Sequence, residues 1–167
     1  AEQFEHVVRH CWQEPEREYQ YLALDLLIKH KRHYLPEQID WFETMITDRS
    51  WWDTVDLLAS HAVGSYLLSY PDKRNALLDR WLNSGHLWLQ RSCLIYQLKY
   101  KEQTDADVLA QLILDLKDHP DFFIKKAIGW ALREYSKINP TFVLEFVDQY
   151  DIATLSQKEA LRHIKKK

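Results

Sequence analysis

Trp52 and Asp56, in the stretch SWWDTVDLLA, are the residues whose types and spacing most directly suggest chemistry. They are four residues apart, so on a helix their side chains share one face. A carboxylate held in place can stabilise a positive charge that develops during a reaction, and the face of a tryptophan ring also attracts cations. The pair is therefore a candidate site for a cationic group. The structural alternative is an ion pair between Asp56 and Arg91 on the next repeat.

The neighbouring residues of this stretch have structural explanations. An apolar stripe at helical spacing, expected to face the core, consists of Trp51, Val55, Leu58 and Ala62. Ser50 is expected to cap the helix, with Asp53 at the third helical position in a box-like start. Asp53 is thereby explained, whereas Asp56 is not.

A second candidate is a basic stripe in the segment DFFIKKAIGWALREYSK. Its members recur at i, i+4, i+7 and i+11, and they are Lys126, Trp130, Arg133 and Lys137. Basic side chains bind phosphates, and an aromatic ring among them suits a partner that carries both phosphates and aromatic groups. The alternative is a solvated charged face with Trp130 half-buried.

Arg91 is the third candidate, because its neighbours along the helix are apolar: Leu87, Trp88, Leu94 and Ile95. A guanidinium in such surroundings is costly unless it is paired or faces a groove. Two interpretations stay open, an ion pair with a carboxylate of a neighbouring helix and a clamp on phosphate oxygens. Lys99 lies two turns further along nearly the same line.

The sequence predicts no metal and no cofactor. His6 and His10 are at i and i+4, but the glutamate of a zincin helix is missing between them, and no cysteine or carboxylate set completes a site. The chain has no phosphate loop, dinucleotide fingerprint or nucleophile elbow.

Composition favours one helical domain over residues 1–167. Apolar residues make up 46% and charged residues 28%, and only 3 glycines and 5 prolines interrupt the chain, which is few for a β-sandwich or barrel. The net charge of −3 is not that of a typical nucleic-acid binder, although a basic patch can be hidden in that average. No apolar run is long enough to span a membrane. Cys11 and Cys93 are isolated and are expected to be reduced, in an intracellular protein.

Helical periodicity runs almost from end to end. The expected helices are 2–13, 15–32, 36–46, 51–69, 73–83, 86–100, 105–117, 121–137, 140–149 and 156–166. The residues that open four long helices, Arg17, Trp52, Trp88 and Phe123, follow one another at steps of 35, 36 and 35 residues. A period in the thirties with two helices per unit predicts an all-α fold, an α-solenoid of antiparallel helix pairs. We expect the second helix of each pair to line a concave, basic face.

Four segments, SWWDTVD, WLQRSCLIYQLKYK, FFIKKAIGWALREYSKINP and LSQKEALRHIK, closely resemble the AlkD-type DNA alkylation repair family. The resemblance extends over essentially the whole chain. Members of this family are HEAT-like repeat DNA glycosylases that release cationic N3- and N7-alkylated purines from duplex DNA, without a metal or a Schiff-base lysine. The resemblance implies an intracellular, monomeric enzyme of base excision repair, cytoplasmic and nucleoid-associated when on DNA.

The resemblance also implies roles for individual residues. The catalytic aspartate of the family matches Asp56, and the two tryptophans beside the lesion match Trp52 and Trp130. The arginine that holds DNA beside the lesion matches Arg91. Further DNA-contacting positions match Lys99, Phe122, Phe123 and Arg133. The family is expected to leave the damaged base stacked in the duplex, whereas most enzymes that act on a base flip it out.

The start of the chain departs from the family pattern. AEQFEHVVRHCW resembles the middle of a family member, so we expect the family's first helices to be missing. Two other function classes remain, a non-catalytic DNA-binding solenoid and a protein-interaction scaffold. Asp56 argues against the first because an acid repels phosphates, and the basic stripe with Arg91 argues against the second.

Overall fold

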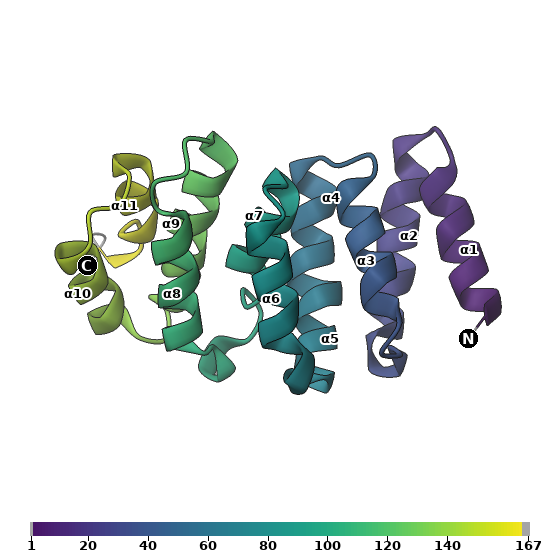
Figure 1. Cartoon of the computed structure of the whole chain (residues 1–167), viewed down its shortest axis with the longest axis horizontal. Coiled ribbons are helices and arrows are strands. Elements are labelled where there is room, and N and C mark those ends of the chain that lie inside the picture. The colour runs from purple at the N-terminus through teal and green to yellow at the C-terminus, as the bar shows by residue number, and fades with distance from the viewer. Residues whose placement is uncertain (1, 165–167) are drawn as a thin grey trace.

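Antiparallel helix pairs stack in a single row from the N-terminal α1 (Glu2–Gln13) to the C-terminal α10 (Pro140–Gln149) and α11 (Thr154–Ala160), as Figure 1 shows. The structure is a computed structural model that describes residues 2–164, and these residues contain helices and no strand. The predicted α-solenoid is therefore confirmed.

The remaining α-helices are short, as expected for stacked helical repeats. They are α2 (Arg17–His30), α3 (Gln38–Thr47), α4 (Trp52–Leu57), α5 (Gly64–Ser69), α6 (Arg74–Asn83), α7 (Leu87–Ile95), α8 (Ala106–Leu116) and α9 (Phe122–Tyr135). Single 3₁₀ turns follow α2, α5 and α7, at η1 (Lys31–His33), η3 (Pro71–Lys73) and η4 (Lys101–Gln103). A π-helical segment, η2 (Leu58–Val63), joins α4 to α5.

The predicted boundaries differ most from the structure at three helices, and by at most two residues at the others. The expected helix 51–69 contains the π-helical segment, and the expected helix 86–100 ends at Ile95. Beyond Ile95 the backbone forms tighter turns, in which the amide of Leu98 donates to the carbonyl of Ile95. The expected helix 156–166 is α11, which starts at Thr154 and ends at Ala160. Residues 165 and 166 of that prediction lie outside the described part of the chain.

The predicted repeat is confirmed at the helix starts. Arg17, Trp52, Trp88 and Phe123 are each the first or second residue of α2, α4, α7 and α9. These second helices of successive pairs contact one another in order, α2 with α4, α4 with α7 and α7 with α9. The face that they form is called the second-helix face below.

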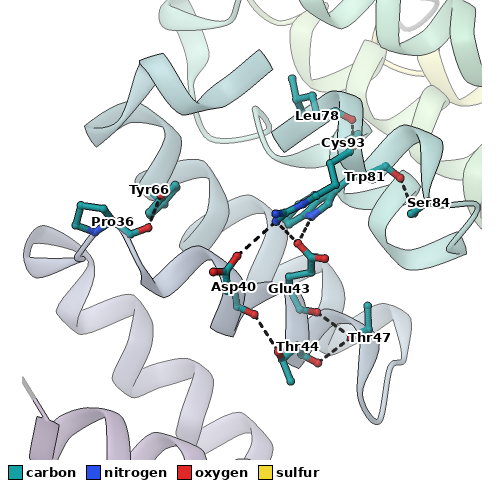
Figure 2. A network of polar contacts seen from close by, with 11 residues as sticks. Pro36, Asp40, Glu43, Thr44, Thr47, Tyr66, Leu78, Trp81, Ser84 and Cys93 are labelled. Carbon is teal, nitrogen blue, oxygen red and sulfur yellow. Dashed lines mark hydrogen bonds and ion pairs between the residues drawn. The ribbon is translucent and has the colours of Figure 1, made fainter. Parts of the chain in front are cut away.

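Polar contacts join the first helices of neighbouring pairs. Trp81 of α6 is fully buried, and its Nε1 donates to Glu43 of α3 over 2.6 Å. Arg80 binds the same carboxylate, and Figure 2 shows Glu43 pointing across the gap between α3 and α6 toward the Trp81 ring. Because a buried indole N–H needs an acceptor, this contact fixes how the two pairs stack.

Gly64 allows α5 to pass close to the end of α7. A Cβ built on Gly64 would lie 2.5 Å from the carbonyl oxygen of Tyr96. The hydroxyl of Tyr100 donates to the Gly64 carbonyl over 2.7 Å, which ties the two helices together at this point. A glycine is needed here because of the neighbouring backbone, since its own backbone is helical.

Within residues 2–164, no helix has the length and apolar composition needed to cross a bilayer.

Candidate functional site

An open cleft of about 420 Å³ lies on the second-helix face, where α4, α7 and α9 meet α11. Its lining residues come from these helices and from the turn after α11, and they are Trp52, Asp56, Arg91, Phe122, Phe123, Lys126, Trp130, Arg133, Glu159 and Arg162. The cleft therefore brings together eight of the ten site residues named from the sequence.

Asp56 and Arg91 form a bidentate ion pair in the wall of the cleft. Arg91 Nε donates to Asp56 Oδ1 over 2.8 Å, and Nη2 donates to Oδ2 over 2.9 Å. Their side chains are 11% and 5% exposed, respectively. The remaining terminal nitrogen of Arg91 donates to the backbone carbonyl of Phe123 on α9. Of the two interpretations of Arg91, the structure shows the ion pair with a carboxylate of a neighbouring helix. The pair holds the Asp56 carboxylate in one orientation.

The environment of Asp56 has opposing effects on its proton affinity. Burial raises the pKa of the Asp56 carboxyl above its ordinary value, and the hydrogen bonds and charge of Arg91 act in the opposite direction. Arg91 is thus the counter-ion of this carboxylate, and burial is the larger of the two influences on its pKa.

The π-helical segment begins two residues after Asp56. The hydroxyl of Ser60 donates to the Asp56 carbonyl over 2.6 Å. A π turn adds a residue to the helical circuit and changes which side chains share a face beyond it. Trp52 and Asp56 precede the π-helical segment and share one face of α4. The segment changes the direction of the side chains that follow it on α5.

Asp53, one turn before Asp56, forms hydrogen bonds with different residues. It accepts bonds from Arg17 and Tyr21 of α2, on the preceding repeat. The predicted capping box is wrong. The residue that flanks the helix start is Trp51, and the hydroxyl of Ser50 instead donates to the carbonyl of Ile46 at the end of α3.

The prediction that Trp51 belongs to the core is also wrong. Trp51 is 50% exposed, whereas Val55, Leu58 and Ala62 of the same stripe are buried. The reason is that Trp51 precedes the helix with extended backbone angles, so helical spacing does not set its direction. Its ring lies against Trp88 and Phe123, with centroid distances of 6.1 Å and 5.7 Å.

The aromatic side chains of the cleft are open to solvent to different degrees. Trp52 is 47% exposed and Phe122 is 57% exposed, whereas Trp130, which follows Lys126 and precedes Arg133 in its stripe, is partly buried. Exposed large aromatic groups beside a buried charge are typical of a surface that a ligand covers.

The basic stripe on α9 is divided between two partners. Lys126 and Arg133 both bind Glu159 of α11, with Lys126 Nζ 3.0 Å from Glu159 Oε2. Lys137 lies beyond the end of α9, although the predicted helix 121–137 includes it, and binds Glu134 over 2.6 Å. Burial acts to raise the pKa of Glu159, but Lys126, Arg133 and Arg162 outweigh it and lower that pKa below its ordinary value.

Glu159 and Arg162 were not singled out from the sequence, although both lie in LSQKEALRHIK. The available signal was Gly129, in the middle of α9. A Cβ on Gly129 would lie 2.6 Å from the Cβ of Glu159, so a helix must approach α9 closely there. Which helix approaches cannot be inferred from Gly129 alone.

Lys99 and Lys137 lie outside the cleft. They line a separate groove of about 330 Å³ between α7, α8 and α9. Lys99 does not continue the line of Arg91, because α7 ends four residues before it. Lys99 is exposed and Lys137 is half-exposed, so both are available to a ligand that extends from the cleft along α9.

Metal-ligating side chains do not cluster in residues 2–164, where no group of three or more histidine, cysteine, aspartate or glutamate residues is placed to hold an ion. Cys11 and Cys93 are free and buried. Burial raises the pKa of the Cys93 thiol far above its ordinary value, so this cysteine is a packing residue without nucleophilic character.

The cleft thus combines a fixed carboxylate, exposed aromatic faces and a cluster of cations on α9 and α11. The carboxylate and the aromatic faces suit a positively charged reacting group. The cations suit phosphates attached to that group. A charged lesion on a nucleic-acid backbone has both features.

Residues 1–164 match the family described as DNA alkylation repair enzyme. The structure is similar, with a TM-score of 0.90, to that of a predicted DNA alkylation repair enzyme from Enterococcus faecalis. The two sequences are 31% identical over 99% of this chain and 78% of the other. No curated protein matches the chain. The match over residues 1–164 shows that the chain belongs to the DNA alkylation repair enzyme family.

Proposed function

We propose that this protein is a monofunctional DNA glycosylase that releases cationic N3- and N7-alkylated purines from duplex DNA. The observation that carries the proposal is Asp56, a buried carboxylate held bidentately by Arg91 in a cleft that also exposes Trp52. A carboxylate fixed in this way is expensive to bury and is oriented for a developing cation.

The reaction follows from the charge of the substrate. An N3- or N7-alkylated purine already carries a positive charge, so the base leaves as a neutral molecule and needs no general acid. When the C1′–N bond breaks, its electron pair goes to the base and the sugar becomes an oxocarbenium ion. Water then adds to C1′ and loses a proton, which leaves an abasic site.

Asp56 stabilises this sugar cation and orients the attacking water, as carboxylates do in glycoside hydrolysis. Trp52 and Trp130 provide ring faces around the same cation. Three of the five N–H groups of Arg91 are committed to Asp56 and Phe123, so its role in the free protein is to position Asp56. No side chain needs to form a covalent bond to the sugar.

The shape of the cleft suits a lesion that stays stacked in the duplex. The cleft is open to solvent and lined on one side by exposed Trp52 and Phe122. Such a surface can press against a sugar and its phosphates from the outside, whereas a flipped base requires an enclosing pocket. Duplex DNA is the proposed partner, bound by one copy of the protein.

A non-catalytic DNA-binding protein is the second candidate function. The observation that favours it is the Asp56–Arg91 ion pair itself, because a neutralised carboxylate no longer repels phosphates. In that case Asp56 would serve only to keep Arg91 in place.

Release of 7-methylguanine from a defined duplex separates the two candidates. Asp56→Asn is expected to lower the single-turnover rate by about 10²- to 10³-fold, the usual loss when a group that stabilises transition-state charge is removed. Asp53→Asn is the matched control, because Asp53 is also paired with an arginine but does not line the cleft. DNA binding without release by the unaltered protein would support the second candidate.

A further inference from the structure

We infer that α11 completes a phosphate-binding site in the cleft, with Arg162 as its third cation and Glu159 as the residue that positions the other two. The inference rests on the proposed function, because it takes the ligand of the cleft to be DNA. Its ligand is a phosphodiester of the strand that carries the lesion.

The approach of α11 to α9 is the first step of the argument. Gly129 of α9 leaves room for the Cβ of Glu159, and the fully buried Ser156 donates its hydroxyl to the carbonyl of Lys125 over 2.7 Å. Figure 1 shows α11 beside α9. The two helices are therefore docked at one fixed register, which places Glu159 between Lys126 and Arg133.

The second step is the charge of this cluster. Lys126, Arg133 and Arg162 all lie within 4.0 Å of the Glu159 carboxylate. Arg133 is also 3.9 Å from Glu134, which pairs with Lys137, so four cations share two anions. Two positive charges remain in excess at the wall of the cleft. An excess of positive charge attracts a phosphate. The Glu159 carboxylate offsets the repulsion between Lys126, Arg133 and Arg162, which lie close together.

The third step is the number of free donors. Lys126 uses one of its three N–H groups on Glu159. Arg133 binds Glu159 through Nη1, and its Nη2 forms no hydrogen bond within residues 2–164, whereas its buried Nε lies 3.9 Å from Glu134 Oε1. The side chain of Arg162 is 62% exposed and lies 4.0 Å from Glu159. Each cation thus keeps donors for phosphate oxygens while Glu159 holds it.

Glu159 is a positioning residue in this arrangement. Its side chain is only 12% exposed, so it acts from behind the cations and does not compete with the ligand at the surface. One oxygen accepts from Arg133 and the other from Lys126. A glutamine keeps the shape but replaces one acceptor with a donor, and it therefore releases one of the two cations.

Affinity for a short undamaged duplex, measured at several salt concentrations, tests the site without requiring excision. Arg162→Gln is expected to weaken binding and to reduce the slope of log K against log salt by about 0.9, the loss of one phosphate contact. Glu159→Gln is expected to weaken binding about fivefold, a typical coupling between contacting residues. This sign is opposite to that of simple removal of a negative charge.

Two exposed residues on first helices provide matched controls. Arg80→Gln on α6 and Glu145→Gln on α10 make the same charge changes outside the cleft and are expected to leave affinity and slope unchanged. In the double variant Lys126→Gln/Glu159→Gln, the second substitution should cost less than it does alone, because Glu159 acts through Lys126.

Two results would overturn the inference while the proposed function stands. One is an Arg162→Gln variant that binds like the Arg80→Gln control, and the other is tighter binding by Glu159→Gln, which would make Glu159 an inhibitory contact. Conversely, the expected binding changes without base release by the unaltered protein would reject the glycosylase and retain the phosphate site. Absence of any duplex binding would overturn both.

Discussion

Asp53 and Asp56 are three residues apart and are each paired with an arginine, yet their proton affinities shift in opposite directions. Burial acts to raise the pKa of both carboxyls. At Asp53 the hydrogen bonds from Tyr21 and Thr54 and the charge of Arg17 outweigh burial, so its pKa is lowered. At Asp56 burial prevails and the pKa is raised. A raised pKa marks a charge that the fold keeps in place at a cost, as expected at a functional site.

The pH dependence of excision should report this shift. Asp56 must be ionised to stabilise the sugar cation, so the rate should fall as the pH decreases, with a midpoint above the ordinary aspartate value of about 3.9. Single-turnover release of 7-methylguanine, corrected for spontaneous loss at each pH, provides the measurement. Because the charge of Asp53 contributes to the raised pKa of Asp56, Asp53→Asn should move the midpoint slightly lower. A rate independent of pH over the range in which the protein stays folded would exclude Asp56 as the titrating group.

The raised pKa of Asp56 affects stability and activity in opposite ways as the pH changes. The folded state binds the Asp56 proton more tightly than the unfolded chain does, so the stability contributed by this group is present at low pH and is lost as the pH rises through its pKa. Activity and stability thus favour different protonation states of one carboxyl.

The two adjacent tryptophans provide an internal comparison. Trp51 and Trp52 are about equally exposed, but only Trp52 lines the cleft. Trp52→Ala is expected to slow excision about tenfold, which corresponds to about 1.4 kcal/mol and lies within the range of cation–π interactions. Trp51→Ala should slow it much less. Equal losses in the two variants, measured at saturating enzyme, would show that the ring faces act through packing alone.

At the scale of helices, the packing of neighbouring pairs depends on close contacts that only glycine permits. Alanine is normally favoured over glycine inside a helix by about 1 kcal/mol. At Gly64 the sign should reverse, because the added Cβ meets the Tyr96 carbonyl oxygen at 2.5 Å and a backbone atom cannot move aside easily.

Gly64→Ala is therefore expected to lower the free energy of unfolding by about 1–3 kcal/mol, the usual cost of overpacking. Denaturant titration followed by circular dichroism measures it. Gly85→Ala is the companion variant, since nothing lies within 4 Å of its added Cβ and only its φ of +67° opposes the change. A gain in stability at Gly64 would mean that α5 and the end of α7 are not held at this distance.

For the whole molecule, the last helix pair is held to the array partly by charge. Glu159 has a lowered pKa in the folded state, so its contribution to stability is present above the ordinary glutamate pKa and is lost as the pH falls through the folded-state value. In a solenoid each repeat contacts only its neighbours, so this loss should loosen α10 and α11 before the rest.

Thermal unfolding of the unaltered protein and of Glu159→Gln tests this expectation. The variant should unfold at a lower temperature near neutral pH, by the equivalent of about 1.5–3 kcal/mol for a hydrogen bond to a charged group. The difference should shrink as the pH falls from the ordinary glutamate pKa to the lowered pKa of the folded state, where Glu159 is itself protonated. A difference that stays constant down to low pH would assign the effect to packing.

Features that depend on short stretches of chain were predictable from the sequence. The helices, their repeat of 35 to 36 residues and the shared face of Trp52 and Asp56 follow from side-chain spacing, which every turn of helix reproduces. The sequence also marked Arg91 as a charge that requires a partner. It left open whether that partner is a carboxylate or a phosphate, because both satisfy the same planar group.

The stacking of the pairs decided the rest, because contacts between repeats depend on side chains more than thirty residues apart. Stacking placed Arg91 on Asp56 and Glu159 between Lys126 and Arg133. It left Trp51 against Trp88 outside the core, and it separated Lys99 and Lys137 from the cleft where α7 ends. Helical periodicity determines which side chains share a face of one helix. The distance and angle between neighbouring helices determine which of those faces meet, and these are properties of tertiary packing.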